Sequence, residues 1–303
     1  MARPGRDPAS LETGLVIAAH GRRYRVELDS GSEIECMTRG KRSDVACGDR
    51  VRVARSGDGA VIESTEPRRT LFYRSDARRQ KLIAANVTQA AIVVAASPPY
   101  SEDLVNRCLV GAEYAGIPAI IVLNKVDLPE AHLASNALAL YEKLGYTVVP
   151  LSAKRDLSPL KAHLEGGLTV LVGQSGMGKS TIINGLVPDA AARVAEISTA
   201  LNSGRHTTTH AEIYRLDAGS HIIDSPGMQE FGLHHLTPDD AAHAFVEFRP
   251  FLGHCRFRDC RHLAEPGCAI IEAAARGEIS QRRLGPYRRL AEELSRKRAA
   301  WES

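Results

Sequence analysis

The stretch with the most specific chemistry lies in the middle of this 303-residue chain, at residues 173–181. It reads GQSGMGKST and matches G-x-x-x-x-G-K-S, the pattern of a loop whose backbone N–H groups surround nucleotide phosphates. An apolar run at 168–172 predicts a buried strand before the loop, and a helix-like segment follows it. We expect Lys179 to reach the β- and γ-phosphates and the Ser180 hydroxyl to hold Mg²⁺. The expected phosphate-binding residues are Gly173, Gln174, Ser175, Gly176, Met177, Gly178, Lys179, Ser180 and Thr181.

A second motif, Asn124-Lys125-Val126-Asp127, indicates which base is bound. The Asp127 carboxylate can accept hydrogen bonds from both the ring N–H and the exocyclic amine of guanine, whereas adenine offers no such donor pair. The motif follows the apolar run 117–123, so it would lie at the carboxyl end of a strand, where open α/β sheets bind ligands. Ser152-Ala153-Lys154 follows the next apolar run. The expected guanine-site residues are Asn124, Lys125, Val126, Asp127, Ser152, Ala153 and Lys154.

A third motif, Asp224-Ser225-Pro226-Gly227, reads D-x-x-G at the end of another predicted strand. We expect Asp224 to hold Mg²⁺ through water and the Gly227 N–H to contact a γ-phosphate. The preceding loop, 198–209, contains three successive threonines. One of them should complete the Mg²⁺ shell when triphosphate is bound, and we favour Thr208.

Four potential metal ligands, Cys255, Cys260, His262 and Cys268, fall within 14 residues near the end of the chain. Three thiolates and one imidazole are a standard closed, tetrahedral set for structural zinc. Crowded cysteines in a chain that we expect to be cytoplasmic favour a metal over disulfides. We therefore expect one structural Zn²⁺. Three buried cysteines beside a chance histidine are the alternative, and His254 is a less favoured ligand.

The elements that must position these motifs change in kind along the chain. Five short segments with alternating polarity, at 14–19, 23–28, 33–37, 50–55 and 60–64, predict a small β-barrel, and an OB-fold fits their number and size. Apolar strands that alternate with helices then predict a mostly parallel sheet with helices on both faces. Beyond the D-x-x-G motif the pattern is helical.

Charge is unevenly distributed along the chain. Residues 1–81 carry 17 Lys/Arg against 12 Asp/Glu, residues 82–248 carry 10 against 17, and residues 249–303 carry 12 against 7. Two basic flanks favour a polyanionic partner, and solvated surface charge is the alternative. In the barrel, basic and aromatic residues would form a face suited to RNA, although a barrel without a nucleic-acid role remains open. They are Arg23, Tyr24, Arg25, Arg39, Lys41 and Arg42.

The order of the motifs is that of a permuted domain. In Ras-like GTPases the phosphate loop comes first, followed by the threonine loop, D-x-x-G, N-K-x-D and S-A-K, whereas here the last two come first. Circular permutation is permissible because domain termini usually lie close together at the surface. Between a barrel and a Cys/His cluster, these motifs resemble the circularly permuted GTPase family over about residues 14–300. The resemblance implies an OB-fold, a permuted GTPase domain and a zinc domain, with hydrolysis of GTP stimulated by the small ribosomal subunit during its late maturation.

The hydrolytic machinery departs from that of Ras, where a glutamine directly after D-x-x-G orients the attacking water. Here Met228 occupies this place and cannot orient a water. Gln229 lies one residue later, and in an extended segment it would point the opposite way. We expect slow intrinsic hydrolysis that a partner raises by ordering the loops. His206 is the candidate for the missing catalytic group, and a solvent-exposed histidine is the alternative.

We thus expect a multidomain chain. Residues 1–12 would be a flexible arm, 13–66 an OB-fold RNA-binding domain, 67–81 a basic linker, 82–235 the circularly permuted α/β P-loop GTPase domain, and 236–303 a mainly helical zinc-binding domain.

The expected ligands are GTP or GDP, Mg²⁺ and Zn²⁺, and the expected partner is the small ribosomal subunit with its rRNA. We expect a location in the cytoplasm without membrane partners, since the sequence shows neither a signal segment nor an apolar run that could span a bilayer. We also expect a monomer without DNA partners. The alternative function is an RNA-binding module whose guanine nucleotide is structural and barely hydrolysed, which Met228 favours. An ATP-using enzyme is opposed by Asp127.

Overall fold

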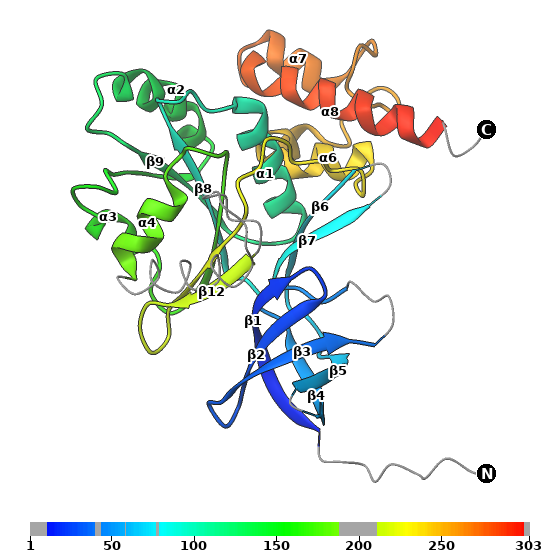
Figure 1. The fold of residues 1–303 in the computed structure, drawn as a ribbon. Helices are drawn as coiled ribbons and strands as arrows, with labels where there is room; N and C mark the ends of the chain where they lie inside the picture. Colours follow the sequence, from blue (N-terminus) through cyan, green and yellow to red (C-terminus); the bar gives the residue numbers. More distant parts are fainter. Residues whose placement is uncertain (1–10, 40–43, 58, 77–78, 188–210, 300–303) are drawn as a thin grey trace, which may run out of the picture.

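The computed structural model describes residues 11–39, 44–57, 59–76, 79–187 and 211–299. Figure 1 shows a small barrel, drawn in blue, below a larger α/β part. Helices from the end of the chain, drawn in yellow to red, lie against one side of that part. The succession of barrel, α/β sheet and helical region is the one predicted from the sequence.

The barrel is built from the first five strands. They are β1 (Glu12–His20), β2 (Arg23–Leu28), β3 (Glu33–Thr38), β4 (Arg50–Ser56) and β5 (Gly59–Thr65). Antiparallel pairs join β1 to β2 and to β4, β2 to β3, and β4 to β5, while a parallel pair joins β3 to β5. Apolar side chains at alternating positions, such as Val16, Val26 and Val51, fill the interior. This closed five-stranded arrangement confirms the predicted OB-fold.

The predicted basic and aromatic face of the barrel is only partly present. Arg23 is exposed, but Tyr24 is buried in the barrel core because successive strand residues point to opposite sides. Arg25 is half-buried and pairs with a carboxylate of the central sheet. Lys41 and Arg42 lie outside the described residues. The prediction of an aromatic contribution from Tyr24 was therefore wrong.

The central sheet follows the predicted strands closely. Its strands are β8 (Gln89–Ala95), β9 (Ala119–Asn124), β10 (Thr147–Pro150), β11 (Leu168–Val172), β12 (Ala211–Arg215) and β13 (His221–Asp224). They lie in the order β10-β9-β8-β11-β13-β12, and β12 is antiparallel to β13 whereas the others are parallel. The carboxyl ends of the parallel strands therefore meet at one edge, which is where the sequence motifs were expected.

Helices cover both faces of this sheet. On one face lie α1 (Glu102–Tyr114) and α2 (Ala131–Lys143), whose Leu109 and Leu138 belong to the largest apolar cluster. On the other lie α3 (Ser158–Lys161) and α4 (Lys179–Leu186), whose Leu160 and Ile182 belong to a second cluster. The predicted three-layer arrangement is confirmed. In the described part of the chain, every helix is too short or too polar to cross a membrane.

The segment predicted as a linker, 67–81, is structured. It contains β6 (Leu71–Ser75), which pairs antiparallel with β7 (Gln80–Ala85). Phe72 is fully buried, its ring centroid lies 5.3 Å from that of Phe231, and the Ser75 N–H donates to Gly232 O at 2.8 Å. Because few of its side chains face inward and many are basic, the hairpin resembles a solvated linker in sequence. It attaches the chain after the barrel to the core of the α/β part.

The barrel and the central sheet are continuous. Strand β1 pairs antiparallel with β12, with Ala18 opposite Glu212 and Ala19 opposite Ala211. Figure 1 shows the two strands where the barrel meets the α/β part. Among the described residues, the barrel strands and the six strands of the central sheet thus form one eleven-stranded sheet.

The C-terminal helices pack on α1. They are α6 (Pro238–Ala244), the 3₁₀ helix η1 (Val246–Phe251), α7 (Ala269–Ala275) and α8 (Gln281–Ala299). Thr237 and Asp240 form a capping box that starts α6, since each side chain bonds the backbone of the other. Helix α6 ends at Ala244, and the chain continues as η1 from Val246. The buried faces of these helices join the same apolar cluster as α1.

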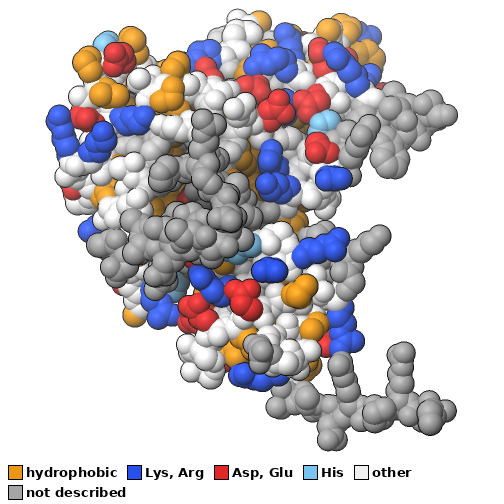
Figure 2. Space-filling model, in the orientation of Figure 1, with side chains coloured by type: hydrophobic (Ala, Val, Ile, Leu, Met, Phe, Trp, Pro, Cys, Tyr) orange, Lys and Arg blue, Asp and Glu red, His pale blue; other side chains and the backbone are white. Residues whose placement is uncertain are grey.

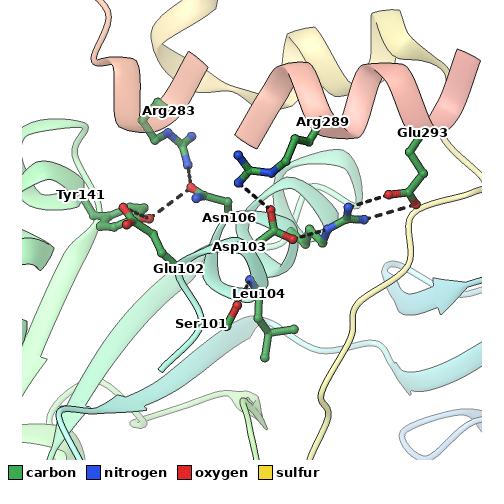
Figure 3. Close-up of polar contacts among 10 residues, drawn as sticks. Ser101, Glu102, Asp103, Leu104, Asn106, Tyr141, Arg283, Arg289 and Glu293 are labelled. Atoms are coloured by element: carbon green, nitrogen blue, oxygen red, sulfur yellow. Dashed lines mark hydrogen bonds and ion pairs between the residues drawn. The ribbon is translucent and has the colours of Figure 1, made fainter. Parts of the chain in front are cut away.

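Ion pairs fasten α8 to α1 (Figure 3). Arg107 of α1 pairs with Glu293 of α8 at 2.6 Å, and Arg289 of α8 pairs with Asp103 of α1 at 3.2 Å. Arg283 is fully buried, and its guanidinium carbon lies 4.4 Å from the centre of a phenylalanine ring. The helical region is therefore held on α1 by specific polar contacts as well as by apolar packing.

Replacing Arg283 by methionine should destabilise the protein strongly. Arg283 donates from Nε to Glu247 at 2.6 Å and also bonds the Asn106 side chain. Without it, a buried carboxylate has no cation, so we expect a loss of about 3 kcal/mol, measured by urea unfolding followed by circular dichroism. The Arg289→Met variant removes an exposed pair and should cost less than about 1 kcal/mol. Equal losses in the two variants would contradict this expectation.

Candidate nucleotide site and metal centre

A cavity of about 570 Å³ opens beside the carboxyl ends of the parallel strands. The cavity is lined by residues of the phosphate loop, N-K-x-D, S-A-K and D-x-x-G, which are the four motifs that the structure describes. Among the lining residues are Asp127, Ser152, Lys179 and Gly227. These motifs are spread over about 100 residues of sequence. They meet because β8, β9, β11 and β13 run parallel and neighbour one another, so that the loops after them share one edge.

The phosphate loop has a backbone that only glycine accommodates. Gly173 and Gly178 have positive φ angles of 146° and 98°. A Cβ atom at Gly173 would lie 2.3 Å from Val93 O, and one at Gly178 would lie 2.2 Å from the amide nitrogen of Asn124. The loop is therefore packed closely against β8 and the N-K-x-D motif.

The Lys179 amine bends back over this loop. Its Nζ atom donates to Gly173 O at 2.8 Å and to Gln174 O at 3.0 Å. Burial lowers the pKa of Lys179, and the neighbouring Asp224 carboxylate opposes this effect. The cation is thus fixed at the cavity wall, where an anionic phosphate would stabilise its charge.

Asn124 and Lys125 join the separate motifs to one another. Asn124 donates from Nδ2 to Met177 O at 2.9 Å, and its Oδ1 accepts from the Ala153 N–H at 2.9 Å. Lys125 donates from Nζ to Ser97 O and to Gly176 O, both at 2.7 Å. Both side chains therefore support the shape of the cavity.

Asp127 is the acidic side chain of the N-K-x-D motif, and it lies at the cavity. The nearby Ser152 hydroxyl lowers the pKa of Asp127, so the side chain is an ionised acceptor at neutral pH. An ionised carboxylate beside the S-A-K loop is the chemistry that recognition of guanine requires.

Some predicted residues turn their side chains away from the cavity. Met177 is buried in the core between the sheet and α4. Gln174 accepts a hydrogen bond at 2.5 Å from the backbone N–H of Ser101, the residue that caps α1. Val126 is exposed but is not among the lining residues. A contact of these three residues with a nucleotide would therefore involve their backbone.

The D-x-x-G segment lies directly against the phosphate loop. The Met228 N–H donates to Gly173 O at 3.2 Å, and a Cβ atom at Gly227 would lie 3.2 Å from the Ser175 backbone. Asp224 is buried and does not itself line the cavity. The Met228 side chain is buried in the main apolar cluster, so it contributes no polar group to the cavity.

Two predicted catalytic residues, His206 and Thr208, lie outside the described residues. Sequence reasoning also missed four residues that line the cavity, Ser97, Pro98, Leu128 and Ser225, the last of which lies within the D-x-x-G motif. The first two directly follow β8, whose carboxyl end lies between those of β9 and β11. The rule that ligands bind at strand ends could have identified them.

The Cys/His cluster is assembled as predicted. Ligand atoms of Cys255, Cys260, His262 and Cys268 all lie within 4.8 Å of one another. The Cys255 and Cys268 sulfur atoms are 3.9 Å apart, and the His262 Nδ1 atom lies 3.4 and 3.3 Å from them. A tetrahedral zinc site with bonds of about 2.3 and 2.0 Å requires S–S and S–N separations of about 3.8 and 3.5 Å. The four residues therefore fit a zinc ion.

The turn that carries His262 is held from two sides. Glu265 accepts hydrogen bonds from the backbone N–H groups of Arg261 and Leu263 at 3.0 and 2.8 Å. From α8, the Tyr287 hydroxyl donates to Arg261 O at 2.8 Å. The metal centre and α8 are therefore parts of one structural unit.

Comparison with known proteins agrees with this geometry. The family model described as RsgA GTPase matches residues 65–234, which is more than half of the chain. A relative from Nitrosospira multiformis, named small ribosomal subunit biogenesis GTPase RsgA, is 50% identical over 302 residues, which cover 98% of this chain and 96% of the relative. The chain belongs to the RsgA GTPase family. This confirms the resemblance on which the sequence analysis rested.

Solved structures extend the agreement to the whole fold of this RsgA family member. YjeQ from Thermotoga maritima is 29% identical, superimposes with a TM-score of 0.71, and is matched over 94% of this chain and 98% of its own. YloQ, described as a circularly permuted GTPase, is 27% identical with a TM-score of 0.67, over 98% and 99% of the two chains. The predicted succession of OB-fold, permuted GTPase fold and helical region with a Cys/His cluster is thus confirmed.

Proposed function

We propose that this protein is a GTPase that binds the small ribosomal subunit and hydrolyses GTP to GDP and phosphate during late maturation of that subunit. The observation that carries the proposal is the single cavity that collects the phosphate loop, N-K-x-D, S-A-K and D-x-x-G. The proposed partner rests on the name of a relative, which is described as a small ribosomal subunit biogenesis GTPase.

In this proposal each motif has one task. Backbone N–H groups of residues 173–181 and the Lys179 amine bind the phosphates, and Asp127 selects guanine. Ser180, which lines the cavity, would hold Mg²⁺ directly, and the buried Asp224 would hold it through water. The bound ion would supply positive charge beside the phosphates. Asn124 and Lys125 fix the positions of the loops relative to one another, since their hydrogen bonds join three of the motifs.

The test is GTP turnover in the presence of purified small subunits, large subunits or free RNA. Small subunits should raise the rate well above the level reached with either of the others. The buried Met228 supports slow intrinsic turnover, because a hydrophobic side chain in the core occupies the position at which Ras has its water-orienting glutamine. A rate that small subunits leave unchanged would favour the alternative, an RNA-binding module with a barely hydrolysed nucleotide.

We further propose that His206 acts in hydrolysis and that Thr208 completes the Mg²⁺ shell. The His206→Ala variant should lose about 100-fold in small-subunit-stimulated turnover, because positioned acid–base groups contribute at least that much. Its affinity for a non-hydrolysable GTP analogue should stay unchanged. His210→Ala is a nearby control. An unaltered stimulated rate in His206→Ala would remove the histidine from the mechanism.

The remaining expectations are proposals of the same kind. The metal held by the Cys/His cluster is zinc, and its role is to hold the fold because a four-ligand set leaves no open position. The barrel, residues 13–66, contacts rRNA, and residues 82–235 and 236–303 form the GTPase and zinc-binding domains. The protein acts as a monomer in the cytoplasm, where its ribosomal partner is found.

A further inference from the structure

One acidic residue lies at the junction between the barrel and the nucleotide site. Glu212 belongs to β12, and its Cα atom is paired with that of Ala18 in the barrel strand β1. On the other side of β12, the Cα atom of Glu212 is paired with that of Asp224, the aspartate of D-x-x-G. A single strand position therefore separates the barrel from a residue proposed to hold Mg²⁺.

The Glu212 side chain is buried and depends on the barrel for its partner. Its Oε1 atom forms an ion pair with Arg25 of β2, and Arg25 also lies 3.3 Å from Glu33 of the barrel. A buried carboxylate is costly unless a cation accompanies it. Movement of β2 away from β12 would thus leave Glu212 with an uncompensated charge.

A second contact links Glu212 to a buried tyrosine of its own strand. The Tyr214 hydroxyl donates to Glu212 Oε2 at 3.1 Å. The Tyr214 ring is buried in the same apolar cluster as Met177 of the phosphate loop and Ile182 of α4. Glu212 is therefore bonded to a member of the apolar cluster that also contains part of the phosphate loop, and it is paired with the D-x-x-G strand.

We propose that Glu212 is a positioning residue that couples the docking of the barrel to the nucleotide state. The inference rests on the proposed function, since it assumes that the barrel contacts the small subunit. Contact with the subunit that shifts the barrel strains the Arg25–Glu212 pair, and the strain reaches Asp224 through the β12–β13 ladder. Such coupling is reciprocal. The factor by which the subunit changes the affinity for the nucleotide is therefore also the factor by which the nucleotide changes the affinity for the subunit.

The chain offers a matched control at the same junction. Arg215 of β12 pairs with Glu27 of β2 at 3.0 Å, with the charges reversed between barrel and sheet. The side chains of this pair are 64% and 34% exposed, compared with 23% and 8% for Arg25 and Glu212. Solvent screens an exposed ion pair, so the Arg215–Glu27 pair should contribute little to coupling between the barrel and the nucleotide site.

The test compares small-subunit affinity in the presence of a non-hydrolysable GTP analogue and of GDP, with the full-length protein. In the Glu212→Gln variant, the ratio of the two affinities should shrink by about 5-fold or more. The Glu27→Gln variant should keep the ratio of the unaltered protein to within about 2-fold. The affinity of the free protein for each nucleotide should change little in either variant, because neither residue lines the cavity.

Two further variants separate coupling from loss of structure. Arg25→Gln removes the other half of the pair from the barrel side and should reduce the ratio as Glu212→Gln does. Adding Arg25→Gln to Glu212→Gln should bring no further reduction, because residues of one pair act as a unit. Thermal unfolding identifies a variant that merely fails to fold. A ratio preserved in both single variants, or reduced equally in Glu27→Gln, would overturn the inference.

The outcome for the unaltered protein distinguishes this inference from the proposed function. If small subunits neither bind nor stimulate hydrolysis, the proposed function fails and the inference fails with it. If the unaltered protein shows stimulation and a nucleotide-dependent affinity that Glu212→Gln retains, only the coupling through Glu212 is refuted.

Discussion

The Asp127→Asn variant should bind xanthine nucleotides and lose at least about 100-fold in affinity for GDP. The carboxylate would be replaced by an amide whose N–H group faces the N–H groups of guanine. A binding site strongly rejects a ligand when two donors face each other, because neither is then hydrogen-bonded. Xanthine carries an oxygen where guanine carries its exocyclic amine, so the same amide can pair with it. Titration with fluorescent GDP and XDP analogues measures both affinities.

The control for this variant is Asp156→Asn. Asp156 is a nearby acidic residue that bonds Ser158 and does not line the cavity. The affinity of the Asp156→Asn variant for both nucleotides should match that of the unaltered protein. If Asp127→Asn loses GDP and XDP binding in equal measure, the residue supports the cavity and does not select the base.

Loss of the metal should unfold the helical region at the end of the chain. In small zinc domains, metal binding contributes about 10–16 kcal/mol of apparent folding free energy. We expect the Cys260→Ser variant to contain no stoichiometric zinc by elemental analysis. Amide hydrogen exchange should accelerate in α7 and around residues 255–268, while the barrel keeps its protection.

The control for the metal prediction is His254→Ala. His254 is exposed and directly precedes Cys255 in sequence, but it does not belong to the cluster of four ligand atoms. This variant should retain zinc and the exchange pattern of the unaltered protein. Zinc that persists in Cys260→Ser, or disappears in His254→Ala, would show that the ligand set is wrong.

Local signals in the sequence were sufficient for most of the fold. The apolar run of β11, the glycines after it and the helix of α4 lie side by side in sequence, so their strand–loop–helix context could be recognised directly. Likewise, the parallel strands carry the motifs at their carboxyl ends, and this rule places distant loops in one cavity. The cavity formed by the phosphate loop, Asp127 and Gly227 could therefore be predicted.

What the sequence did not reveal depends on long-range packing. The pairing of Ala18 with Glu212 joins strands almost 200 residues apart, and no local pattern encodes it. The sequence of the β6–β7 hairpin resembles a linker because the hairpin is ordered by the packing of Phe72 on Phe231, which are distant in sequence. Similarly, nothing near Gln174 indicates that its side chain turns to Ser101. Tyr24 is different, because strand alternation alone could have placed it inside the barrel.

The pairing of β1 with β12 also covers part of an edge of the central sheet. Without the barrel, β12 would be the outermost strand of the central sheet among the described residues, and its unpaired N–H and C=O groups would form a template for another chain. The barrel covers Ala211 and Glu212 on this side, and Arg25 neutralises the charge there. A fragment that begins after residue 66 should therefore form dimers or aggregates at concentrations where the full chain does not. Studies of the isolated nucleotide-binding part would then include effects of an edge at Ala211 and Glu212 that the barrel covers in the full chain.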